Sequence, residues 1–149
     1  MRRWRFLVLV GGLLLGLASG AGAGMSETDT SSLLARINGI RAEHHLKPLR
    51  ARPALATCAG AHTRYLDGIH VLQHDSADGT PAPTRIRRAY RARIVGEVLA
   101  YGPSTEWIVR AWMRSPTHRA LLLDRAFRSI GIGIVHDDST FWVTADLGS

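Results

Sequence analysis

Apolar residues recur at helical spacing in two stretches of the first half of the chain. Between Ser31 and Leu46 the repeat follows the N-cap candidates of "TDTSS", and it consists of Leu33, Leu34, Ile37 and Ile40. A second stripe starts after Pro53, a favoured first-turn residue, and consists of Leu55, Cys58, Ala59, His62, Tyr65, Leu66 and Ile69. The two patterns predict two helices, each burying one face.

Two residues of the second stripe carry chemistry, His62 and Cys58. A single histidine on an apolar stripe is more often a hydrogen-bonded core residue than a ligand, and we expect the core role for His62. Cys58 is the only cysteine of the chain, so an intramolecular disulfide and a cysteine-rich zinc site are excluded. We interpret Cys58 as a small buried apolar residue.

The middle of the chain pairs a turn-rich segment with an apolar one. "HDSADGTPAPTRI" is rich in turn formers, with Asp78-Gly79 the strongest, so His74 is expected at the entrance to a loop. "RIVGEVLAY" then predicts a strand that contains Glu97. A carboxylate inside an apolar strand is costly to bury unless it has a partner.

A helical pattern that starts at Ser104 stops at Ser115-Pro116, although the apolar repeat would allow it to continue. Ser115 and Pro116 form an N-cap and first-turn pair, which places His118 near the third position of a new helix. The positive end of a helix disfavours imidazolium, so the break would keep His118 neutral and able to bind a metal or accept a proton. The alternative is a break that only turns the chain.

The last stretch, "SIGIGIVHDDSTFWVTADLGS", predicts a β-hairpin. Its two strands are joined by the turn "HDDST", which begins with His136.

The first 23 residues have the pattern of an export signal. Arg2, Arg3 and Arg5 precede the apolar run "FLVLVGGLLLGLA", and the small-residue end predicts cleavage after Ala23. An uncleaved anchor is the alternative, but a run of about 13 residues is short for a membrane span. We therefore expect a secreted or periplasmic protein that is not an integral membrane protein after cleavage. Residues 24–32 are expected to form a linker and residues 33–149 one domain. We also expect a monomer.

The mature chain is moderately basic, with 16 Lys and Arg after the three signal arginines are removed from 19, against 12 Asp and Glu. Five of these residues form a run with Tyr90, namely Arg85, Arg87, Arg88, Arg91 and Arg93. No nucleic-acid motif accompanies the run, so we expect no nucleic-acid partner and interpret it as a short helix with a solvated basic face. The alternative is contact with an anionic envelope surface such as lipid headgroups.

The ordered motifs of the chain resemble those of the CAP superfamily, also called SCP. The resemblance covers roughly Leu33 to Gly148 and rests on "LLARINGIRAEHHLKPL", "PALATCAGAHTRYL", "LQHDSADGTPAPTRI", "VGEVLAYG", "WMRSPTHRALLL", "FRSIGIGI" and "FWVTADLG". It implies an α/β/α sandwich, with a small antiparallel sheet between helical layers and a polar cleft.

The resemblance also implies the cleft residues. The family's two histidines and one of its glutamates match His74, His118 and Glu97, while Ser115 stands where many members have a second glutamate. Two asparagines usual in the family are replaced as well, by Val98 and Leu121.

Two imidazoles and a carboxylate could bind zinc or another divalent metal with one position open. A buried hydrogen-bonded cluster of His74, Glu97 and His118 is the alternative to a metal site.

Two function classes follow from these residues, and they leave open whether the protein is an enzyme. The first is a non-catalytic secreted module that binds a small apolar ligand, such as a lipid or sterol, or an envelope partner. The second is a metal-dependent hydrolase of the peptidase kind, which would need a general base beside the metal-bound water. A serine hydrolase is disfavoured because no G-x-S-x-G motif is present.

Overall fold

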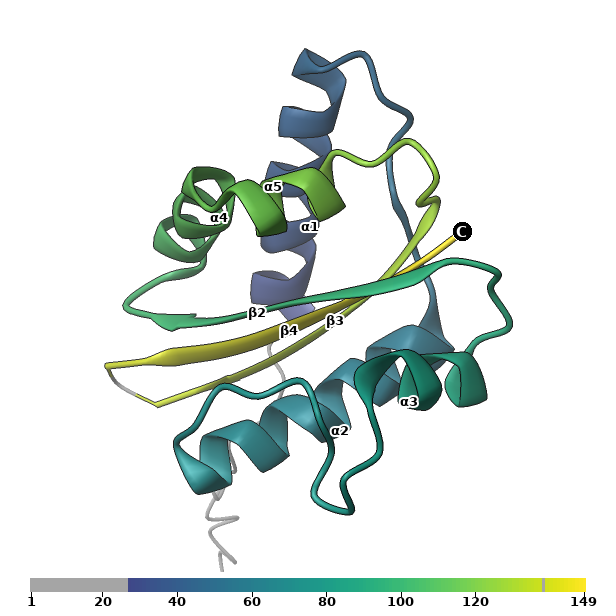
Figure 1. Ribbon diagram of the computed structural model, residues 1–149. Helices are drawn as coiled ribbons and strands as arrows, with labels where there is room; N and C mark the ends of the chain where they lie inside the picture. Colours follow the sequence, from purple (N-terminus) through teal and green to yellow (C-terminus); the bar gives the residue numbers. More distant parts are fainter. Residues whose placement is uncertain (1–26, 138) are drawn as a thin grey trace, which may run out of the picture.

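A computed structural model of the protein describes residues 27–137 and 139–149, which form three layers (Figure 1). A sheet separates α1, α4 and α5 from α2 and α3, which confirms the expected α/β/α sandwich. The helices are α1 (Glu27–Glu43), α2 (Pro53–Ile69), α3 (Ala82–Ala89), α4 (Thr105–Arg114) and α5 (Pro116–Leu122). The strands are β1 (Arg50–Ala51), β2 (Val95–Gly102), β3 (Ser129–His136) and β4 (Phe141–Gly148). None of the described helices is both long and apolar enough to span a bilayer.

The sheet has the strand order β1-β3-β4-β2. Its three long strands are antiparallel, and β3 and β4 form the predicted hairpin. The two-residue strand β1 joins β3 in parallel, so the complete sheet is mixed. His136 is the last residue of β3 rather than a turn residue.

One face of the sheet is the main apolar core. Alternate residues of β3 lie in this core with Leu33 of α1 and Trp112 of α4, namely Ile130, Ile132 and Ile134. Val98 and Leu121, which replace the two usual asparagines, belong to or pack against the same core. These two departures from the family pattern therefore serve packing.

The opposite face of the sheet lies directly under α2. A Cβ on Gly131 would lie 2.0 Å from the carbonyl carbon of Leu55, and one on Gly133 would lie 2.5 Å from the amide nitrogen of Gly60. Only glycine permits the helix backbone to approach the strand this closely. The alternation of isoleucine and glycine in "SIGIGI" thus separates a core face from a helix-contact face.

The N-terminal boundary differs from the expected one. The first helix begins at Glu27, so residues 27–32 are helical and not a linker. The predicted signal, residues 1–23, lies outside the described residues.

Arg41 of α1 fixes the end of α5, the helix that carries His118. Its guanidinium is completely buried and donates to the carbonyl oxygens of Leu122, at 2.6 Å, and of Phe127, at 3.3 Å. These carbonyls lie at the end of α5 and just before β3, so the side chain ties both segments to α1.

The helix that contains the basic run is shorter than expected. Helix α3 ends at Ala89, so Arg91 and Arg93 lie after it, and both are exposed like Arg87 and Arg88. Arg85 does not belong to this basic face, because its side chain is only 14% exposed. The expectation of a solvated Arg85 is therefore wrong.

Candidate functional site

Glu97 of β2 is the centre of a buried polar cluster beneath α2. Its Oε1 accepts a hydrogen bond from Nδ1 of His74 at 2.7 Å, and its Oε2 forms an ion pair with the guanidinium of Arg85. Nε2 of His62 lies 3.9 Å from Oε2. A buried carboxylate needs such partners, so Glu97 is compensated on both oxygens.

Arg85 connects three segments through its guanidinium. Besides its ion pair with Glu97, it donates to the carbonyl oxygen of His74 at 2.9 Å and to Oγ of Ser76 at 3.1 Å. Its role in the site was missed from sequence. A signal was present, because Arg85 shares a helical stripe with the buried residues Ala82 and Ile86.

The two histidines beside Glu97 have opposite protonation preferences. The hydrogen bond to Glu97 raises the pKa of His74, against the smaller effect of burial. Burial lowers the pKa of His62, whose Nε2–H donates to the carbonyl oxygen of Gln73 at 2.9 Å. His62 therefore has the expected core role, whereas His74, with a side chain 58% exposed, faces solvent as the charged partner.

His118 lies in the first turn of α5 and is half-buried. Its pKa is lowered first by burial and then by the charge of nearby His74. A lowered pKa keeps the imidazole neutral, and burial is its main physical cause. Ser115 is the N-cap residue of α5 by position, although its side chain makes no capping hydrogen bond.

The three expected ligands do not assemble into one metal site. His74 and Glu97 are bonded to each other, but no hydrogen bond or ion pair joins His118 to Glu97 in the part of the chain that the structure describes. Across the described residues, no three His, Cys, Asp or Glu side chains come together in a way that could hold a metal ion. Since Arg85 and His74 occupy both oxygens of Glu97, this carboxylate does not fit a ligand role.

Asp146 of β4 is a second buried carboxyl group that sequence reasoning missed. It pairs with Glu97 across the sheet, is completely buried, and neither oxygen has a well-oriented hydrogen-bond partner among the described residues. Burial, and then the charge of Glu97, raises the pKa of Asp146 to about 8. The signal in the sequence was an acidic residue at an inward position of the strand "FWVTADLG".

Cys58, on the buried face of α2, lies beside Asp146. Burial, and then the neighbouring Asp146, raises the pKa of the Cys58 thiol to about 12. The thiol therefore stays protonated and weakly nucleophilic near neutral pH, in agreement with the expected packing role.

A groove of about 370 Å³ opens next to His118. Exposed apolar side chains form part of its lining, namely Leu72, Tyr101 and Trp107. A Cβ on Gly102 would lie 2.3 Å from the Trp107 ring, so the missing side chain allows this ring to pack on the end of β2. Ser115 and His118 supply polar groups to the lining, next to the Tyr101 hydroxyl.

Comparisons with known proteins agree with this architecture. The family model described as the cysteine-rich secretory protein family, CAP, matches residues 34–146. The YkwD protein of Bacillus subtilis, itself uncharacterized, is 31% identical over 113 residues, which cover 74% of this chain and 44% of YkwD. The chain thus spans less than half the length of this relative.

Solved structures share the fold at low sequence identity. An outer surface protein of Borrelia burgdorferi has a TM-score of 0.76 and 23% identity, over 83% of this chain and 93% of that one. An extracellular SCP-domain protein of Bacillus anthracis has a TM-score of 0.71 and 23% identity, over 81% of this chain and 40% of that one. NaASP2, solved with Zn²⁺, has a TM-score of 0.62 and 12% identity, over 84% of this chain and 81% of that one. With the family model matching most of its length, the chain belongs to the CAP family.

Proposed function

We propose that this protein is a secreted, non-catalytic binding module that takes a small apolar ligand in the groove beside His118. The observation that carries the proposal is the gathering of Leu72, Tyr101 and Trp107, three exposed apolar side chains, around one concave surface. Exposed apolar surface of this kind is typical of ligand or partner sites.

The state of Glu97 supports binding over catalysis. A metal-dependent hydrolase needs a general base that can take a proton from the metal-bound water. Both oxygens of Glu97 are engaged, by His74 and by Arg85, and Ser115 replaces the second glutamate of the family pattern. Neither glutamate position of the family pattern therefore supplies a free carboxylate for this step.

The lining of the groove indicates the chemistry of the ligand. It contains no Lys, Arg, Asp or Glu, and its polar side chains include Ser115 and His118. A neutral imidazole and a hydroxyl can each donate or accept one hydrogen bond. A lipid or sterol with one uncharged polar end fits this combination.

The test is the binding of a fluorescent sterol and of a fluorescent fatty alcohol to the mature protein. Trp107→Ala should weaken binding at least about tenfold, roughly 1.4 kcal/mol, because it removes an exposed aromatic wall of the groove. Ile94→Ala is the matched control, since Ile94 is an exposed apolar residue outside the lining. Equal binding by the wild type and both variants would sink the proposal.

Divalent-metal binding is the second candidate, and one contact favours it. The hydrogen bond to Glu97 uses Nδ1 of His74 and leaves Nε2 as the nitrogen for a ligand. A carboxylate that orients a histidine in this way is common behind metal ligands. Here His74 and His118 would hold the ion and Glu97 would orient His74, and a bound zinc ion would supply a Lewis acid.

Calorimetric zinc titration tests this candidate. His74→Ala and His118→Ala should each weaken zinc binding at least about tenfold, and affinity should fall as pH drops through about 6 because protons compete for the imidazoles. His136→Ala is the control, because His136 lies five residues along the sheet from the Glu97 register, about 17 Å away. Unchanged zinc affinity in the His74 and His118 variants would exclude the site, whereas chelator-sensitive turnover would favour a hydrolase.

In our proposal this module acts at the cell envelope, and the basic face and the predicted signal support this part of the proposal. Four exposed arginines form that face, namely Arg87, Arg88, Arg91 and Arg93. Exposed positive charge of this density suits an anionic surface such as lipid headgroups. Residues 1–23 would direct export before cleavage after Ala23.

A further inference from the structure

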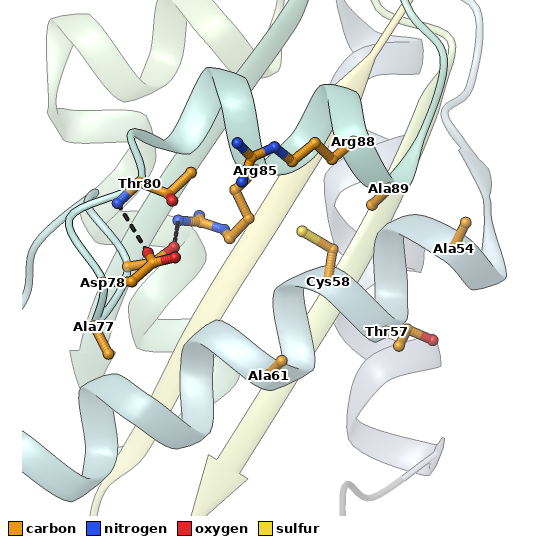
Figure 2. A pocket seen from close by; sticks show the side chains of 11 residues that line it. Ala54, Thr57, Cys58, Ala61, Ala77, Asp78, Thr80, Arg85, Arg88 and Ala89 are labelled. Carbon is orange, nitrogen blue, oxygen red and sulfur yellow. Dashed lines mark hydrogen bonds between the residues drawn. The ribbon is translucent and has the colours of Figure 1, made fainter.

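A second hollow, of about 580 Å³, lies between α2, α3 and the turn at residues 76–80 (Figure 2). Its α2 wall is made of small side chains at positions i, i+3, i+4 and i+7, namely Ala54, Thr57, Cys58 and Ala61. Helices in contact usually fill such a stripe with larger apolar side chains. The small residues here leave an open, mostly apolar space beside the point where the two helices pack together.

The opposite wall is basic. Figure 2 shows Arg85 and Arg88 of α3 across the hollow from Cys58 and Ala61. The Arg85 side chain already has three partners, which are Glu97, the carbonyl oxygen of His74 and Ser76. Arg88 is exposed, and the structure gives it no hydrogen bond or ion pair within the described residues. Arg88 is therefore the guanidinium available to a ligand.

The one acidic residue of the lining does not cancel this charge. The Asp78 carboxylate accepts a hydrogen bond from the backbone N–H of Thr80 at 2.9 Å, and this bond is the main reason why its pKa is lowered. Asp78 is thus committed to its own turn and stays ionised. Because Glu97 already compensates Arg85, Arg88 is the guanidinium of the lining whose charge is left for a ligand.

We propose that this hollow binds a single-chain amphiphile with an anionic headgroup. The alkyl chain lies against the small-residue wall of α2, and the headgroup forms charge-assisted hydrogen bonds with Arg88. The volume is within the range of small-molecule sites. This ligand class differs from that of the groove beside His118, which has no charged lining residue.

Octyl phosphate, titrated calorimetrically into the mature protein at low ionic strength, tests the site. Arg88→Gln should weaken binding at least about tenfold because it removes the headgroup contact. Ala61→Leu should weaken it to a similar extent by filling the hollow, and Ala61 is exposed, so the core is untouched. The matched control is Arg87→Gln, which removes the same charge from the neighbouring exposed position outside the lining.

Three further measurements test the chemistry of the ligand and distinguish this hollow from the groove beside His118. Inorganic phosphate and octanol should each bind at least about tenfold more weakly than octyl phosphate, and Trp107→Ala should leave octyl phosphate binding unchanged. The proposal is overturned if Arg87→Gln weakens binding as much as Arg88→Gln, or if Ala61→Leu has no effect. Phosphate binding as tight as that of octyl phosphate, or loss of binding in Trp107→Ala, would also overturn it.

Discussion

Asp146 carries a carboxyl group that is fully buried beside Glu97, at a position where the sheet meets α2. Its pKa is raised from 3.8 to about 8, first by burial and then by the charge of Glu97. The folded state therefore holds this proton more tightly than the unfolded chain. The resulting stabilisation is complete below pH 4 and is lost as pH rises towards 8.

Asp146→Asn should remove this dependence, because the amide keeps the shape of the side chain and does not ionise. We expect the free energy of unfolding to fall less between pH 5 and pH 8 in the variant than in the wild type, measured by urea denaturation. His74 changes stability in the same sense through its raised pKa, so the difference between the two proteins is the relevant quantity.

Asp78→Asn serves as the control for Asp146. The pKa of Asp78 is lowered, so its contribution to stability changes only below about pH 4. A pH slope in Asp146→Asn equal to that of the wild type would show that Asp146 is ionised at neutral pH.

At the scale of elements, the local pattern predicted most of the fold. Periodicity and turn chemistry predicted the starts of α2 and α5 at Pro53 and Pro116, the strand around Glu97, and the β-hairpin. Helix α1 begins at Glu27, earlier than the apolar repeat at Leu33 indicated, because its first turns are polar.

Contacts between elements were harder to predict. The role of Arg85 depends on the packing of α3 against β2, and the position of Asp146 depends on the pairing of β4 with β2. Both are consequences of tertiary structure that a basic run or an apolar strand does not show by itself. The isoleucine and glycine alternation of β3 was present in the sequence, but its meaning required the position of α2.

At the scale of the whole molecule, three distant segments meet at the candidate site. They are the loop carrying His74, strand β2 with Glu97, and helix α5 with His118. Arg85 of α3 forms an ion pair with Oε2 of Glu97 in the same region. The family resemblance predicted the first three residues. It did not predict that an arginine would neutralise the carboxylate, and this arrangement is why we favour a binding module.

The most direct test of that account is the titration of the histidine ring protons by nuclear magnetic resonance, in the mature wild type and in Glu97→Gln. If Glu97 holds His74 as its charged partner, the pKa of His74 lies above its ordinary value of 6.5 in the wild type and falls in the variant, while the pKa of His118 lies below 6.5. A His74 that titrates at or below 6.5 in both proteins would contradict the account, because Oε1 of Glu97 would then be free to act as a base or to bind a metal.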